Sequence, residues 1–564
     1  MLTKGAIGNL INRYSAVLKK CSLMNTFGSL AVAGMLVAGG VSGAWAEGTT
    51  PAGWDNTHVV ANDTTLSGTY QGFAQTNKTL AGVATVDYVT TGVSVANNAK
   101  FINNSMTVGS AGGALKLLNG IAIGQNVEFS GNKATESAWG GGAIYIKLAN
   151  GKTASATQTV TIDENAIFKG NIATSLGGAI ALEYGQLEIK KGASFTNNSA
   201  TAGGAIAVWT DTTDHDYNTT TNTLTLTDAT FTSNTAGTNA VTKTESQSAV
   251  ANVDGSGGAV FLAGAGTNTF TNTTFEGNQA LGENGKGGAV YMAGGTLTVE
   301  NVVFKDNRAE PGNSMGGAVA LGHDGNITSA SFKDSSFIGN RATGAGGAIS
   351  FANTAATTAG NQKILTLTNI DFKNNTSAGV GGAIRNYLGI VKFDITKDMT
   401  YSGNTAGLNS DGTFGKLYTD YGGFLNLQGG NPTNPEYASK AEFNVTADKT
   451  LTIGEESTKG SAVDSIASAH GTGTTITKSG TGTLTVNGSM KAYTGAIEVK
   501  EGTLNMATGF GEVSNGIQLR VNANKTGADA VAGFAASEMT IADGASVNMG
   551  DLNVTYQTPG GENI

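Results

Sequence analysis

The sequence is poor in cysteine, proline and charge. Its 564 residues include one cysteine, Cys21, and five prolines, and charged residues make up only 13%. A single thiol excludes a disulfide framework within the chain. Low charge combined with 39% hydrophobic residues excludes a disordered chain, which would need high charge and few aliphatic side chains. The 83 glycines show no period of three, so a collagen-like chain is excluded as well.

Basic charge is also scarce. The net charge is −9, and loss of residues 1–46 with their four basic side chains would take it to −13. Nucleic acid is therefore not expected as a partner. The same loss would remove Cys21 and leave no thiol. That suits a chain that stays unfolded and uncrosslinked during export, although a core large enough to need no disulfide explains it equally well.

Residues 1–46 have the pattern of a secretory signal. Two lysines precede the uncharged apolar stretch 23–41, and an A-x-A cleavage site follows at Ala44 and Ala46. Glycines interrupt the apolar stretch directly before that site, which favours a cleaved signal over a membrane anchor. Near the other end, the sequence lacks the alternating ten-residue segments of a membrane barrel, so we expect that this chain does not form its own pore.

A repeated motif dominates the rest of the chain. Phe-x-x-Asn occurs nine times, and Tyr401-Ser-Gly-Asn404 is a worn tenth copy. Each of the nine is followed by Gly-Gly-Ala and then Leu, Ile or Val, with about 33 residues from copy to copy, which is typical of a solenoid. The nine pairs are Phe101/Asn104, Phe129/Asn132, Phe168/Asn171, Phe195/Asn198, Phe231/Asn234, Phe275/Asn278, Phe304/Asn307, Phe337/Asn340 and Phe372/Asn375.

The unit can be interpreted residue by residue. Aliphatic-Thr-aliphatic pieces such as 297–299 alternate with period two, as in a strand with one buried face. An odd number of residues separates that piece from Phe304, so the chain must turn between them. Asn301, like Asp228 and Asn369 in other copies, is placed to form this corner. The Gly-Gly pair forms another, where φ is positive or a second backbone passes closely.

We therefore expect an all-β protein, a right-handed parallel β-helix with about three short strands per coil. Stacked coils would form an internal Phe ladder and, at a corner, an Asn ladder whose amides bond from coil to coil. The repeated Phe and Asn are interpreted as structural. The expected organisation is a signal peptide at 1–46, a cap or first part of the β-helix at 47–96, the repeat β-helix at 97–425, and C-terminal coils at 426–564.

The paired motif resembles the repeat of chlamydial polymorphic membrane proteins and related autotransporter passengers, over about residues 97–404. A second stretch, 477–506, is similar to the passenger-associated repeat near the C-terminal end of many passengers. The resemblance implies an outer-membrane translocator barrel as partner. Because no barrel is recognised here, we expect a truncated or fragmentary passenger, or a barrel encoded separately.

Residues that could carry chemistry are few. The aspartates and His215 within 211–216 form the best cluster for Ca²⁺, but this loop lacks the glycine turn and terminal Glu of a calcium loop. His323-Asp324 is interpreted as a corner in solvent. Ser256 belongs to a repeat corner rather than to a protease nucleophile loop. We therefore assign no catalytic residue, no cofactor site and no metal site.

The resemblance and the polar composition together suggest a function in adhesion or self-association through a polar rod surface. The expected partners are a second copy, a host surface or a glycan. The expected location is the cell surface or outer membrane of a Gram-negative bacterium, or the periplasm or medium if the chain is truncated. One alternative is a secreted β-helix lyase or hydrolase acting on polysaccharide, and a second is an inert spacer or a truncated, non-functional passenger.

Overall fold

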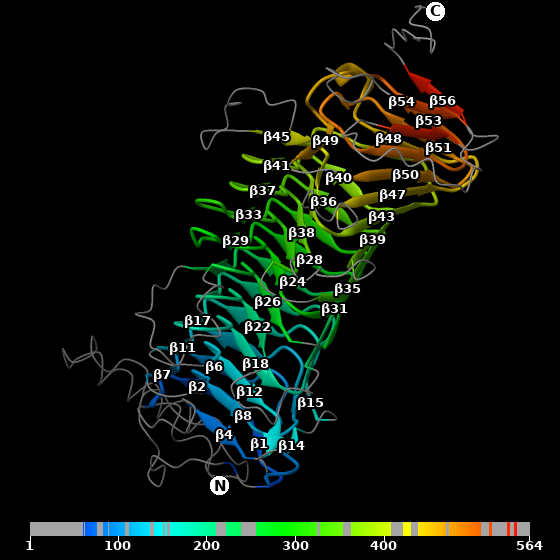
Figure 1. The fold of residues 1–564 in the computed structure, drawn as a ribbon. Helices are drawn as coiled ribbons and strands as arrows, with labels where there is room; N and C mark the ends of the chain where they lie inside the picture. The colour runs from blue at the N-terminus through cyan, green and yellow to red at the C-terminus, as the bar shows by residue number, and fades with distance from the viewer. Residues whose placement is uncertain are drawn as a thin grey trace, which may run out of the picture.

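The computed structural model shows an elongated coil of strands, with β4 (Ala84–Val86) near one end and β56 (Ser546–Met549) near the other (Figure 1). The expected signal segment, with Ala44 and Ala46, and the loop 211–216 lie outside the described residues. The structure describes residues 60, 62–75, 83–87, 89–107, 112–135, 140–150, 153–154, 158–209, 222–237, 255–264, 266–323, 327–353, 362–407, 421–429, 438–469, 473–508, 518–521, 538–541 and 546–549.

Four parallel sheets run along the coil, and each takes one strand from every repeat coil. A typical coil consists of β31 (Gly295–Glu300), β32 (Val303–Lys305), β33 (Arg308–Ala309) and β34 (Val319–Leu321). We name each sheet by its first strand. The β1 sheet has 16 strands that include β1 (Thr65–Leu66), and the β2 sheet runs from β2 (Thr69–Gln71) to β40 (Asp371–Lys373). The β3 sheet runs from β3 (Ala74–Gln75) to β45 (Thr405–Ala406). The β4 sheet runs from β4 (Ala84–Val86) to β49 (Ile466–Ala469).

The β-solenoid expected from the sequence is confirmed, with four strands per coil in place of about three. The additional strand is the two-residue strand that follows each ladder asparagine, such as β33 after Asn307. The residue before that asparagine has positive φ, for example 53° at Asp306, and this turns the chain into a new strand. Within the described residues there is no α-helix, and the 3₁₀ turn η5 (Glu456–Thr458) lies in the C-terminal coils. The right-handed sense of the coil stays a prediction.

The repeated phenylalanines stack inside the coil. All nine are fully buried, and successive rings lie parallel with centroids between 4.6 Å (Phe168–Phe195) and 5.3 Å (Phe337–Phe372) apart. Tyr70 extends the stack at its N-terminal end, 5.0 Å from Phe101. These aromatic contacts run through one continuous hydrophobic core, which supplies the main driving force for stacking the coils.

The repeated asparagines form a second ladder. Each lies at the corner between the β2-sheet and β3-sheet strands of its coil, with its side chain fully buried. Each donates from Nδ2 to Oδ1 of the asparagine in the next coil, at 2.9 or 3.0 Å, and Asn404 of the worn copy accepts the last of these bonds. The nine donors are Asn104, Asn132, Asn171, Asn198, Asn234, Asn278, Asn307, Asn340 and Asn375.

One member shows how each amide of this ladder is satisfied. Asn234 donates from Nδ2 to Oδ1 of Asn278 in the next coil at 3.0 Å and to the carbonyl of Phe195 in the previous coil at 2.9 Å. Its Oδ1 accepts from both Nδ2 and the backbone N of Asn198. Because each amide is satisfied on both sides, burial of these polar groups is stabilising rather than costly.

The corners explain the remaining residues of the motif. Asn301, Asp228 and Asn369 have φ of 55°, 47° and 52°, so the Asx corner lies where the sequence predicts it. In the Gly-Gly pair the two glycines serve different needs. Gly287 has a φ of 68°, whereas a Cβ on Gly288 would collide with a glycine carbonyl of the next coil.

The C-terminal coils change one wall of the solenoid. The β2 sheet ends at β40, and a five-stranded sheet from β44 (Met399–Tyr401) to β56 (Ser546–Met549) follows it. The Phe stack ends where Tyr401 meets Phe372 edge-on, at an interplanar angle of 87°. The Asn ladder ends on a carboxylate, because Asn404 donates from Nδ2 to Oδ1 of Asp464 at 2.7 Å.

Candidate functional site

The outer face of the β1 sheet carries a continuous polar row. Parallel registers align these outward residues one per coil, at about the 4.8 Å separation of neighbouring strands. We call this set the β1-sheet row. It consists of Thr161, Glu188, Thr225, Thr269, Thr298, Ser331, Thr366, Lys392, Glu442, Thr477 and Glu498. The row gives the rod a long surface rich in hydroxyl groups.

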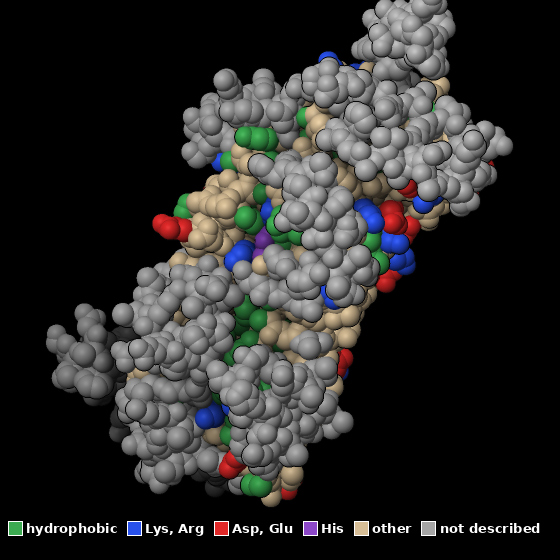
Figure 2. All heavy atoms as spheres, viewed as in Figure 1, with side chains coloured by type: hydrophobic (Ala, Val, Ile, Leu, Met, Phe, Trp, Pro, Cys, Tyr) green, Lys and Arg blue, Asp and Glu red, His purple; other side chains and the backbone are tan. Residues whose placement is uncertain are grey.

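The outer face of the β4 sheet is different in character. Tyr145 on β12 (Ile144–Lys147), Phe261 on β26 (Val260–Ala263) and Tyr291 on β30 (Val290–Met292) form, with several alanines, a buried cluster separate from the interior core. Figure 2 shows hydrophobic side chains gathered along the middle of this face, over β22 (Ile206–Trp209) and β26 in Figure 1. The sequence interpretation, which placed only polar residues outside, missed this stripe because its members are far apart in the chain.

Charged groups lie at the N-terminal end of this stripe. Tyr145 donates its hydroxyl to Glu183, and Lys147 pairs with the same carboxylate at 2.7 Å. Burial, together with the charge of Lys147, lowers the pKa of Lys116 below its ordinary value. One buried carboxylate therefore holds a tyrosine and a lysine from the neighbouring strand in place.

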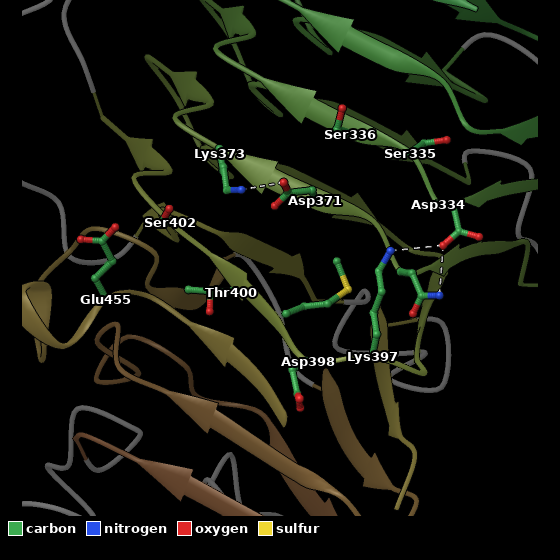
Figure 3. A pocket seen from close by; sticks show the side chains of 12 residues that line it. Asp334, Ser335, Ser336, Asp371, Lys373, Lys397, Asp398, Thr400, Ser402 and Glu455 are labelled. Atoms are coloured by element: carbon green, nitrogen blue, oxygen red, sulfur yellow. Dashed lines mark hydrogen bonds and ion pairs between the residues drawn. The ribbon is translucent and has the colours of Figure 1, made fainter. Parts of the chain in front are cut away.

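A polar pocket of about 520 Å³ opens on the outside of the coil where the β2 sheet ends (Figure 3). Asp334 accepts from Asn369 at 3.2 Å and pairs with Lys397 at 3.4 Å, while Asp371 pairs with Lys373 at 2.7 Å. Asp398 and Glu455 also line the pocket, so its lining has four carboxylates against two lysines and is net acidic. It lies over the junction between β40 and β44.

The residues of the repeated motif lie apart from all of these surfaces. Every phenylalanine and asparagine of the nine pairs is fully buried, with the rings stacked in the core and the amides bonded to one another, so none of them has a polar group left for an external ligand. The phenylalanines are Phe101, Phe129, Phe168, Phe195, Phe231, Phe275, Phe304, Phe337 and Phe372. Their asparagine partners are Asn104, Asn132, Asn171, Asn198, Asn234, Asn278, Asn307, Asn340 and Asn375.

The other residues considered in the sequence fall into different places. His323, expected at a corner in solvent, is half-buried with Nε2 2.9 Å from Oγ of Ser350. Ser256 is fully buried within the repeat corner. In the described ranges, no three His, Cys, Asp or Glu side chains lie close enough together to hold a metal ion. The same part of the chain contains no helix of the length and hydropathy needed to cross a membrane.

Comparison with known families agrees with this geometry. The Chlamydia polymorphic membrane protein repeat matches residues 126–147, 272–293, 334–352 and 369–387. Each matched segment begins at an Asx residue with positive φ, such as Asn272, and ends at the β4-sheet strand of its coil. The chain carries repeats similar to those of Chlamydia polymorphic membrane proteins. The sequence predicted an autotransporter-like passenger built from such repeats, and this prediction is confirmed.

A curated relative points the same way. The chain is 35% identical over 147 residues to a probable autotransporter, YfaL, of Escherichia coli (strain K12). The alignment covers 24% of this chain and 10% of the relative, so this chain spans about a tenth of that protein's length. No solved structure matches.

Two residues that complete the repeat architecture escaped the sequence interpretation. Tyr70 begins the Phe stack one coil early, in a copy where Phe73 replaces the ladder asparagine. Asp464 ends the Asn ladder, although it is 60 residues beyond Asn404. Tyr70 could have been found, because it is an aromatic residue about one repeat length before Phe101. Nothing in the sequence marks Asp464 as the end of the ladder.

Proposed function

We propose that this chain is the surface-displayed part of an autotransporter-like protein, and that it mediates adhesion or self-association. The likeness to polymorphic membrane protein repeats and to a probable autotransporter supports display at the bacterial surface through a translocator barrel. The observation that carries the adhesive role is the β1-sheet row. It repeats one polar group per coil over eleven coils in a fixed register.

Regular repetition favours adhesion through many weak contacts. Hydroxyl groups of Thr225, Thr269 and Thr298 stand one above another, so a partner with a matching repeat can engage all of them at once. Once the first contact has formed, each further one is made at high effective concentration. A second copy of the same rod has such a repeat. Stacked coils also hold the row in register without help from a partner.

The experiment displays the chain on cells by fusion to a translocator barrel, with surface amount matched by antibody labelling. Thr225, Thr269 and Thr298 are replaced together by Arg to place like charges along the row. We expect cell clumping and attachment to host cells to fall several-fold, because stacked positive charges repel a matching row.

A matched control replaces three residues by Arg on the outside of the β2 sheet, Thr196 on β20 (Ser194–Thr196) and Thr230 and Thr232 on β24 (Thr230–Thr232). This control should clump as the unchanged chain does. Equal loss in both variants would show that net charge, rather than the row, controls clumping. No clumping by the unchanged chain would leave the inert spacer as the better explanation.

A further inference from the structure

Four outward side chains form a square patch on the β4 sheet, at its C-terminal end. They lie on β42 (Ile384–Tyr387) and β46 (Leu425–Gln428), where Arg385 is in register with Asn426 and Tyr387 with Gln428. Outward orientation follows from the neighbours, since Ile384, Leu425 and Leu427 are fully buried in the core between them. No residue of this patch belongs to the Phe or Asn ladder.

Arg385 has no anionic partner among the described residues. Its Nη2 donates to Oε1 of Gln428 at 2.8 Å, its Nη1 lies 3.6 Å from Sδ of Met315, and its guanidinium carbon lies 5.1 Å from the ring centroid of Tyr387. Within the described part of the chain, no carboxylate pairs with it.

The neighbouring strands offer no anion either. No Asp or Glu occurs on β34, β38 (Ile349–Ala352), β42, β46 or β49. Burial lowers the pKa of the Arg385 guanidinium below its ordinary value, yet a guanidinium keeps its charge in proteins. A half-buried cation without a counter-charge is costly, and a bound anion would relieve that cost.

Asn426 is the second, independent sign of a ligand. The side chain is fully buried, and neither Nδ2 nor Oδ1 has a hydrogen-bond partner in the part of the chain that the structure describes. Buried amides are almost always paired, because an unmade hydrogen bond costs the desolvation of the group. The ladder asparagines of this protein follow that rule, so Asn426 stands out against them.

The chemistry of the patch selects the ligand. A planar guanidinium binds a carboxylate through two parallel hydrogen bonds. Oδ1 of Asn426 needs a donor, which a carboxylate alone does not supply. A sugar that carries a carboxylate offers both, since each hydroxyl group donates and accepts. We propose that Arg385, Tyr387, Asn426 and Gln428 bind a uronic acid residue of an acidic polysaccharide. This deepens the proposed adhesive function, on which it rests, by naming the class of partner.

The test measures binding of a hyaluronan tetrasaccharide, which contains glucuronate, to the purified full chain by calorimetry. R385Q should weaken binding at least about tenfold, the loss expected for a charge-assisted hydrogen bond. N426A should weaken binding as well, while its melting temperature stays the same or rises, because an unpaired buried amide has been removed. The same tetrasaccharide with its carboxylates reduced to alcohols should not bind.

The matched control is R341Q, since Arg341 pairs with Glu310 at 2.9 Å elsewhere on the coil, and this variant should bind as the unchanged chain does. Absence of binding by the unchanged chain, equal affinity of R385Q, or equal binding of a hexaglutamate peptide would each overturn the proposal. Binding is measured on the purified chain and clumping on cells, so failure here and failure of the adhesive function are distinguishable.

Discussion

The end of the Asn ladder makes the stability of the C-terminal coils depend on pH. Asp464 is fully buried, and its two oxygens accept from Nδ2 and N of Asn404 and from the N of Gly403, at 2.7 to 3.0 Å. Burial raises the pKa of this carboxyl from an ordinary 3.8 to about 6, against the opposing effect of those hydrogen bonds, and the charge of Glu455 adds to the increase. The folded state therefore holds the proton more tightly than the unfolded state.

The sign and size of the effect follow from this shift. Below pH 3.8 both states are protonated, and between 3.8 and 6 only the folded state keeps the proton, so the free energy of unfolding falls as the pH rises through this range. A shift of roughly two units corresponds to about 3 kcal/mol. D464N has no titrating proton at this position. We therefore expect the unfolding free energy of the unchanged chain, relative to that of D464N, to fall by about 2 to 3 kcal/mol between pH 4 and pH 7.

Urea unfolding of both proteins at a series of pH values measures this difference, and any constant loss caused by the substitution cancels from its pH dependence. D306N is the matched control, because Asp306 is exposed and other coils have Asn at the same corner. A difference that rises with pH would refute the reasoning, since it would mean that the three hydrogen bonds outweigh burial and lower the pKa. A flat difference would show that the two effects cancel.

Three further predictions concern the repeat itself, each measured as a change in unfolding free energy. N234A should cost about 3 kcal/mol or more, because it leaves several buried ladder groups unpaired, whereas N301A, at an exposed corner, should cost about 1 kcal/mol. G258A should unfold its coil, since the added Cβ collides with backbone of the next coil. G277A should cost only about 1 kcal/mol of strain at positive φ, and equal costs of the two variants would contradict the stacking argument. F231L should cost about 1 to 2 kcal/mol through lost ring stacking, and no change would exclude a role for the ladder in stability.

Local spacing was enough to predict the solenoid, but not what lies between its coils. The position of Asn301 two residues after an alternating strand predicts a corner, because the face of the next aromatic residue is fixed by counting. The two-residue strand β33 has no periodicity to detect, so the fourth sheet was missed. The patch of Arg385 and Asn426 depends on the register between coils, which varies with the length of each insertion. Sequence spacing alone therefore could not bring these two side chains together.

The ladders also explain why a binding site belongs on the β4 sheet. From the β1-sheet strand through the ladder asparagine to the β3-sheet strand, chain length is nearly constant from coil to coil, as over 267–280 and 364–377. Extra residues in that part would move an asparagine out of register and leave its neighbours in the ladder unpaired. Differences in coil length accordingly fall before or after the β4-sheet strand, as between β22 and β23 (Thr223–Thr227). The β4 sheet is thus the one wall whose surroundings can change without cost to the ladders, and its outer face carries the unpaired arginine.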